Sequence, residues 1–94
     1  MGATHFDCGS VYVRYAEPKG WYADVKYNIN FPANTKPIVV ATPVHNAHVA
    51  NLGNCGGFVE QWDDERKNKS FGVAFYIDGV PKTEAILVNW IACI

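Results

Sequence analysis

The longest regular pattern in the chain is an alternation of apolar and polar side chains over residues 21–31. One face of this segment is apolar throughout and carries Trp21, Ala23, Val25, Tyr27, Ile29 and Phe31. The other face carries Tyr22, Asp24, Lys26, Asn28 and Asn30. A β-strand separates such sets onto two faces, whereas a helix would mix them at every turn. The pattern predicts one long, half-buried strand that ends at Pro32, because proline offers no ladder donor.

Further strands are predicted at residues 11–15, 38–44, 57–63, 71–77 and 85–94. The connections between them have the composition of turns, with a Gly/Pro turn at residues 17–20 and a charged loop at residues 63–70. Residues 78–82 form a second Gly/Pro turn between two strong strands, which predicts a hairpin. Residues 45–56 show no readable pattern.

Six closely spaced strands and no helical pattern predict an all-β fold, a six-stranded antiparallel β-sandwich. The chain has 94 residues, of which 49% are hydrophobic and 18% charged, and its net charge is -1. This composition predicts a single domain over residues 1–94, with residues 1–4 outside the folded part. It excludes a disordered chain and a basic nucleic-acid module, and no apolar run is long enough for membrane insertion.

The last predicted strand is apolar on both faces. Ile86, Val88 and Trp90 lie on one face, and Ala85, Leu87, Ile91 and Cys93 lie on the other with Asn89 as the one polar member. A strand of this kind is covered on both sides. The pattern indicates a subunit interface on the second face, and the alternative is a strand at the centre of the sandwich.

The histidine, cysteine and carboxylate residues of this chain, which could in principle bind a metal or act as acid–base catalysts, do not form a convincing site. His45, His48 and Cys55 are nitrogen and sulfur donors, but a fourth zinc ligand is missing, so we expect surface histidines and no metal or cofactor. The odd cysteine count favours three partly buried thiols, with one bridge and one thiol as the alternative. The carboxylates at residues 63–65 run into basic residues, as in a solvated loop. We therefore do not expect an enzyme, which would need a cleft with a perturbed titratable pair.

Aromatic side chains are the remaining candidates for a binding surface: Trp21, Tyr22, Trp62, Tyr76 and Trp90. Aromatic rings can stack on sugar rings while nearby amides and carboxylates hold the hydroxyl groups. Trp90 is expected in the core or an interface, and Trp21 is expected to be half-buried. Trp62, beside Asp63, is the best exposed candidate.

Several segments in order resemble H-type lectin-like domains. They are Phe6-Asp7-Cys8-Gly9-Ser10, Lys26-Tyr27-Asn28-Ile29-Asn30-Phe31, Lys36-Pro37-Ile38-Val39-Val40, and the stretch from Ser70-Phe71 to Asn89-Trp90-Ile91-Ala92. The resemblance implies six-stranded sandwiches that assemble as parallel homotrimers. Invertebrate and slime-mould members bind N-acetylgalactosamine and galactose. Val39-Val40-Ala41-Thr42-Pro43 and Asn89-Trp90-Ile91-Ala92 look closer to the versions in bacteriophage tail-fibre, baseplate and neck proteins.

The chain departs from the family at the positions that matter most. Cys8 matches a bridged cysteine of some members, but the partner position looks like Phe75, so that disulfide cannot form. Asp78 and Gly79 stand where the animal lectins offer a Trp-His pair to the sugar. The family's arginine that holds the sugar hydroxyls aligns near Gly53, so this chain has no arginine at that position. Glu17 is similar to an acidic residue in the first hairpin of the family. The resemblance thus implies the fold of the family but not its known galactose-binding site.

These observations predict a non-catalytic, carbohydrate-binding receptor-recognition module of a phage tail fibre or baseplate, located on the virion or outside the cell. Its partners would be a glycan and two further copies of the chain, with no nucleic acid. The expected ligand loops are residues 17–21, 45–54 and 78–82, and the expected site residues are Glu17, Trp21, Trp62, Asp63, Asp78 and Lys82. The alternative is a structural trimerisation module of a virion appendage that binds no small ligand.

Overall fold

A computed structural model describes residues 5–44 and 54–94, which form six antiparallel strands in one sheet. The strands are β1 (Phe6–Ala16), β2 (Gly20–Lys26), β3 (Ile38–Pro43), β4 (Cys55–Glu60), β5 (Ser70–Ile77) and β6 (Ile86–Cys93). Their order in the sheet is β3-β6-β1-β2-β5-β4. The described residues contain no helix, and hence none that could cross a membrane. The prediction of an all-β, antiparallel fold with six strands is confirmed.

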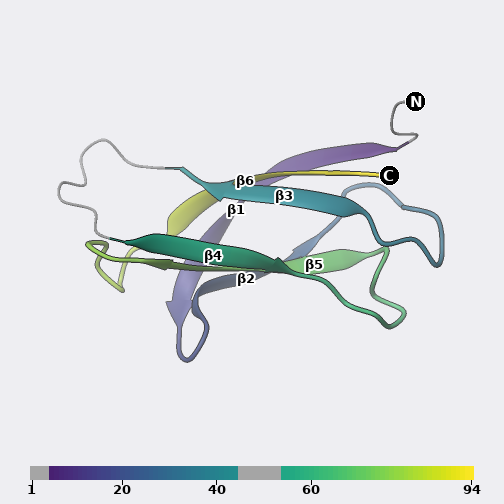
Figure 1. Cartoon of the computed structure of the whole chain (residues 1–94). Helices are drawn as coiled ribbons and strands as arrows, with labels where there is room; N and C mark the ends of the chain where they lie inside the picture. The colour runs from purple at the N-terminus through teal and green to yellow at the C-terminus, as the bar shows by residue number, and fades with distance from the viewer. Residues whose placement is uncertain (1–4, 45–53) are drawn as a thin grey trace.

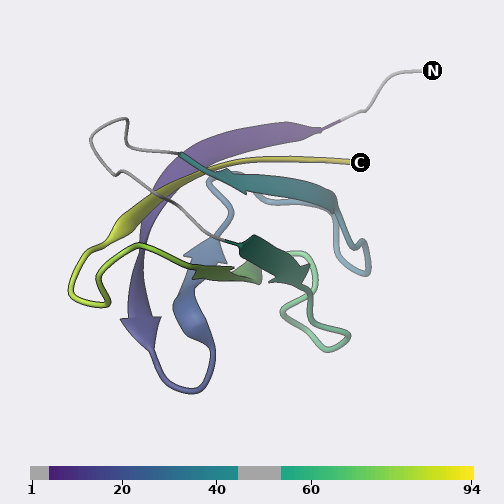
Figure 2. The same ribbon diagram turned by 60° about the vertical axis from the view of Figure 1, so that its left-hand side comes forward.

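The sheet folds back on itself, so that β3, β6 and β1 face β2, β5 and β4 (Figure 1). Strand β1 belongs to both halves, because Phe6–Val13 pairs with β6 and Arg14–Ala16 pairs with β2. It curves from one half into the other (Figure 2). The two outermost strands, β3 and β4, approach each other, which makes the arrangement nearly barrel-like.

The core lies between the two halves and is built from the inward side of every strand. Its centre is aromatic: Tyr27 lies 4.8 Å from Phe31 and 5.3 Å from Phe71, and Phe71 lies 5.2 Å from Trp90, measured between ring centroids. Tilted and edge-on ring pairs of this kind add to the free energy gained by burial alone. The remaining side chains of this core are Val13, Trp21, Val25, Val73, Phe75, Ile77, Ile86, Val88 and Ala92.

The predicted strand at residues 21–31 is too long, because β2 ends at Lys26. The carboxylate of Asp7 accepts hydrogen bonds from the backbone nitrogen of Asn28 (2.6 Å) and from its side-chain amide (3.2 Å). This amide also donates to the carbonyl of Cys8 (3.0 Å). The chain is thereby tied to β1 instead of continuing in the ladder, and Ile29, predicted to face inward, is exposed.

The predicted hairpin at residues 78–82 is wrong. Strand β5 pairs with β2 and β4, whereas β6 pairs with β1 and β3, so the two strands flanking this turn do not pair with each other. Residues 78–85 instead carry the chain from one half of the sheet to the other. The strand predicted at residues 57–63 is displaced as well, since β4 runs from Cys55 to Glu60.

Tyr27 has a buried hydroxyl with no hydrogen-bond partner among the described residues. The neighbouring side-chain amide of Gln61 donates instead to the carbonyl of Pro37 (2.6 Å). Burial raises the pKa of Tyr27 to about 12. Because the unfolded chain ionises this phenol near its ordinary pKa of 10.0, stability is fully present below pH 10 and is lost as the pH rises toward 12.

We expect Tyr27→Phe to remove part of this alkaline loss and to leave stability at pH 7 unchanged or raised by about 1 kcal/mol, because an unsatisfied buried hydroxyl is removed. Urea unfolding at pH 7, 10 and 11 measures both effects. A variant that loses stability with pH as steeply as the parent would contradict this role of Tyr27.

Candidate functional site

The connections between strands gather at the two ends of the sheet, and this sorts the predicted site residues into two groups. The β1–β2 turn and the β5–β6 connection lie at one end, which also receives the end of β3 and the start of β4. Glu17, Trp21, Asp78 and Lys82 belong to this end, called here the turn end. Trp62 and Asp63 lie at the opposite end, between β4 and β5. Of the predicted loop 45–54, all but Asn54 lies outside the described residues.

Glu17 and Lys82 meet above a tyrosine at the turn end. The hydroxyl of Tyr15 donates a 2.5 Å hydrogen bond to Glu17 Oε1. Lys82 Nζ lies 3.9 Å from the same oxygen and 4.8 Å from the centroid of the Tyr15 ring. Both charged side chains are mostly exposed, so they are available to a ligand at little cost in desolvation.

Trp21 lies beneath this cluster. It is only 2% exposed, and its indole nitrogen donates to the carbonyl of Glu84 (2.9 Å), which ties the β5–β6 connection to the start of β2. Its ring packs edge-on against Tyr15 at 5.0 Å. Gly20 precedes it with φ of +81°, and a Cβ there would lie 2.7 Å from the carbonyl oxygen of Phe75. Trp21 thus supports the turn end and does not face the solvent.

Asp78 lies beside Tyr76 at the start of the β5–β6 connection. Its backbone nitrogen donates to the carbonyl of Asn54 (2.9 Å). Hydrogen bonding to the Asp78 carboxylate raises the pKa of Tyr76, and the proximity of Tyr15 raises it further while Lys82 lowers it. Tyr76 is 59% exposed. Tyr76 therefore interacts with Asp78, Tyr15 and Lys82, and the last two in turn contact Glu17.

The opposite end is held by its own ion pairs. The guanidinium of Arg66 lies 4.3 Å from the centroid of the Trp62 ring and contacts Asp64 (2.7 Å). Hydrogen bonding to Arg66 lowers the pKa of Asp64 to about 2. Asp63 pairs with Lys36, which joins the β4–β5 loop to the segment before β3. Trp62 is half-buried rather than openly exposed, and one face of its ring is covered by Arg66.

Two aromatic residues were missed by sequence reasoning. Tyr15 ends the predicted strand at residues 11–15 and was not named as a site residue, although its place just before the turn at residues 17–20 allows its hydroxyl to reach the end of the sheet. Phe58, which is 61% exposed, follows two glycines that carry no hydrophobic signal, so its outward direction could not be read.

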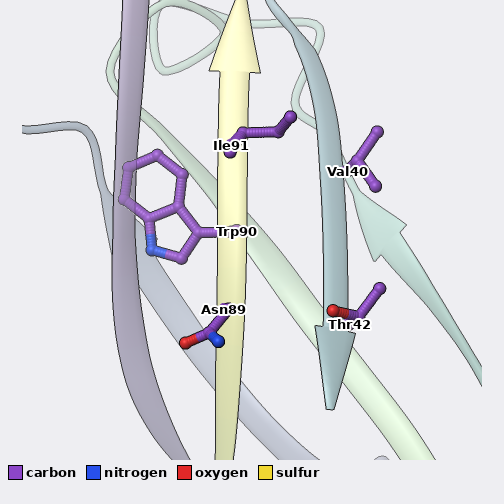
Figure 3. A pocket seen from close by; sticks show the side chains of 5 residues that line it. All are labelled: Val40, Thr42, Asn89, Trp90 and Ile91. Atoms are coloured by element: carbon purple, nitrogen blue, oxygen red, sulfur yellow. The ribbon is translucent and has the colours of Figure 1, made fainter. Parts of the chain in front are cut away.

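A second feature is the outer surface of β3, β6 and β1, called here the apolar face. Four rows of paired residues cross it, and they contain no charged side chain: Ile38, Cys93 and Phe6; Val40, Ile91 and Cys8; Thr42, Asn89 and Ser10; Val44, Leu87 and Tyr12. Phe6, Ile38 and Tyr12 are each more than 60% exposed. A shallow hollow of about 200 Å³ on β3 and β6 is lined by Val40, Thr42, Asn89, Trp90 and Ile91. Figure 3 shows the side chains of these five residues.

The described residues hold no group of three or more His, Cys, Asp or Glu side chains placed to bind a metal ion. His45 and His48 lie outside the described residues. Cys8, Cys55 and Cys93 are free thiols, as preferred from the sequence, but the expectation that they are partly buried is met by Cys93 alone, because Cys8 and Cys55 are exposed.

Neither a scan against protein-family models, nor a search of curated proteins, nor a search of solved structures found a match to this chain.

Proposed function

We propose that the chain is a non-catalytic carbohydrate-binding module, similar to H-type lectin-like domains, in which β-sandwich protomers assemble as a homotrimer. The observation that carries the proposal is the convergence of Glu17, Asp78 and Lys82 at the turn end, with Tyr15 and Tyr76 beside them. Segments far apart in the sequence thus supply polar groups to one small area.

This set of groups suits a ligand rich in hydroxyl groups. Carboxylates accept hydrogen bonds from hydroxyls, the ammonium of Lys82 donates them, and a phenol does both. A tyrosine ring also offers an apolar face next to its polar tip. Exposed groups of this kind bind weakly at each site, and three sites in one assembly multiply the strength of attachment to a multivalent surface.

The homotrimer is supported by the apolar face. Two adjacent rows of this face leave Phe6, Ile38, Val40 and Ile91 each more than half exposed, and a contiguous group of exposed apolar side chains is typical of an interaction surface. A standard interface buries about 800 Å² from each partner. The same face favours a second candidate function, a structural module that assembles and binds no small ligand.

The biological setting proposed is receptor recognition by a phage tail fibre or baseplate, on the virion or outside the cell. The support for it is the ordered set of segments that resembles the phage versions of the family, above all Val39-Val40-Ala41-Thr42-Pro43 and Asn89-Trp90-Ile91-Ala92.

A glycan array that includes bacterial surface polysaccharides tests the carbohydrate proposal. We expect at least one glycan to bind, and Asp78→Ala and Lys82→Ala each to weaken that binding about tenfold by removing hydrogen bonds to charged groups. Asp63→Ala removes a carboxylate from the opposite end and is expected to bind as the parent does. Assembly without binding to any glycan would favour the structural module.

A further inference from the structure

We propose that the binding surface extends from the turn end along the outside of β4 and β5, where a notch takes an uncharged oligosaccharide of at least two sugar units. The notch consists of Gly56 and Phe58 on β4 and Tyr76 on β5. This inference rests on the proposed carbohydrate function and names the class of ligand more closely.

The ladder between β4 and β5 places these three residues on one face. Gly56 pairs with Tyr76, and Phe58 pairs with Ala74, so the two aromatic rings lie diagonally across the pair. Diagonal neighbours in an antiparallel pair are roughly 7–8 Å apart. Phe58 is 61% and Tyr76 59% exposed. Two large aromatic side chains thus stand in solvent on either side of a residue without a side chain.

Space is open above Gly56. A Cβ built at this position meets no atom within 4 Å, whereas at Gly57, the next residue, it would lie 2.3 Å from Phe75. Ala74, which faces outward between Phe58 and Tyr22, is almost fully covered, whereas Gly56 is exposed and forms the accessible base of the notch. A ring placed over Gly56 therefore reaches the sheet itself and contacts the aromatic side chains from the side.

The charges around the notch favour a neutral ligand. Lys19 Nζ lies 3.7 Å from Glu60 and 4.1 Å from the centroid of the Tyr22 ring, and Lys82 is shared between Glu17 and Tyr15. Each of these cations already has a carboxylate partner. Asp78, beside Tyr76, adds a negative charge that repels phosphate and other anions. Apolar rings with a hydrogen-bonding border match the C–H faces and hydroxyl groups of an uncharged sugar chain.

The notch is continuous with the turn end, because Tyr76 is the last residue but one of β5, and Asp78, at the start of the β5–β6 connection, follows two positions later. A sugar unit held at the turn end would place the next unit of its chain over Gly56. This continuity is the reason for proposing an oligosaccharide rather than a single terminal sugar.

Affinity gel electrophoresis of the full chain in soluble neutral polysaccharides (dextran, galactomannan and a mixed-linkage β-glucan), with heparin as the anionic comparison, tests the proposal. We expect a neutral polysaccharide to slow the protein and heparin not to. Phe58→Ala, and Gly56→Val, which fills the notch at an open site of an edge strand, should each weaken the retardation at least fivefold. Ile29→Ala, an exposed apolar residue outside the notch, should not change it.

The outcomes separate this inference from the function on which it rests. If Asp78→Ala weakens binding while Phe58→Ala and Gly56→Val leave it intact, the notch is not used and the carbohydrate proposal stands. If none of the polysaccharides and no glycan of the array binds, both fail. If Phe58→Ala changes the molar mass in light scattering, the notch is a contact between protein chains, and the inference is overturned.

Discussion

Replacing Ile91 by aspartate is expected to convert the proposed homotrimer into monomers. Ile91 lies in the second row of the apolar face, between Val40 and Cys8, and it is 59% exposed in the single chain. In an assembly that covers this face, each copy would bury one unpaired carboxylate, which costs several kcal/mol per site. In the monomer the same side chain stays in water, so the fold itself should lose little stability. Light scattering at micromolar concentration measures the change.

Phe58→Asp provides the matched control for this experiment. Phe58 is about as exposed as Ile91, but it lies on the outside of the other half of the sheet. The control should keep the molar mass of the parent, and circular dichroism should show that both variants remain folded. An assembly that survives Ile91→Asp would show that the interface lies elsewhere, and a monomeric parent would remove the homotrimer proposal altogether.

The strands were predictable because a strand that is buried on one side shows a regular alternation of apolar and polar residues in the sequence. Val73, Phe75 and Ile77 alternate with outward residues, and all three are buried as expected. The doubly apolar last strand was also informative. The structure buries its Ile86, Val88 and Trp90 side and leaves the Ile91 side open, so the surplus of apolar residues has no partner within the described part of this chain.

Strand ends and strand pairing were not predictable, since both depend on contacts between distant residues. The alternation continues past Lys26, but Asp7, about twenty residues earlier, withdraws Asn28 from the ladder through two hydrogen bonds. Likewise, the residues of β5 and β6 indicate which side of each strand is buried, but they do not indicate which strands pair with it. A short turn between two strong strands favours a hairpin locally, and here the packing of the two halves of the sheet against each other overrides that preference.

In the candidate site too, local features were predictable from the sequence and long-range contacts were not. Turn chemistry identified the segments that hold Glu17, Asp78 and Lys82, but only the register of β1 with β2 and of β2 with β5 shows that they share an end. Trp62 and Asp63 have equally suitable chemistry, and the topology places them at the other end. Trp21 was expected to be half-buried, and the inward row of β2 takes it fully into the core.

Gly57→Ala is expected to destabilise the fold by about 2–3 kcal/mol, a large part of the 5–15 kcal/mol typical of a small domain. The added Cβ would lie 2.3 Å from Cδ1 of Phe75 and 2.6 Å from the carbonyl oxygen of Ala74. The first atom belongs to a buried ring and the second to the backbone of the neighbouring strand, so neither can move away without disturbing the core. In thermal unfolding the midpoint should fall by roughly 10–20 °C for a chain of this length.

Gly56→Ala tests whether that loss is due to the close approach rather than to the loss of a glycine from β4. The two residues are adjacent in one strand, but a Cβ at position 56 meets nothing within 4 Å. Because alanine restricts the unfolded chain more than glycine does, this variant should be neutral or more stable by about 0.4–1 kcal/mol. Equal losses in the two variants would mean that β4 needs glycine for its backbone and that Phe75 does not pack over position 57.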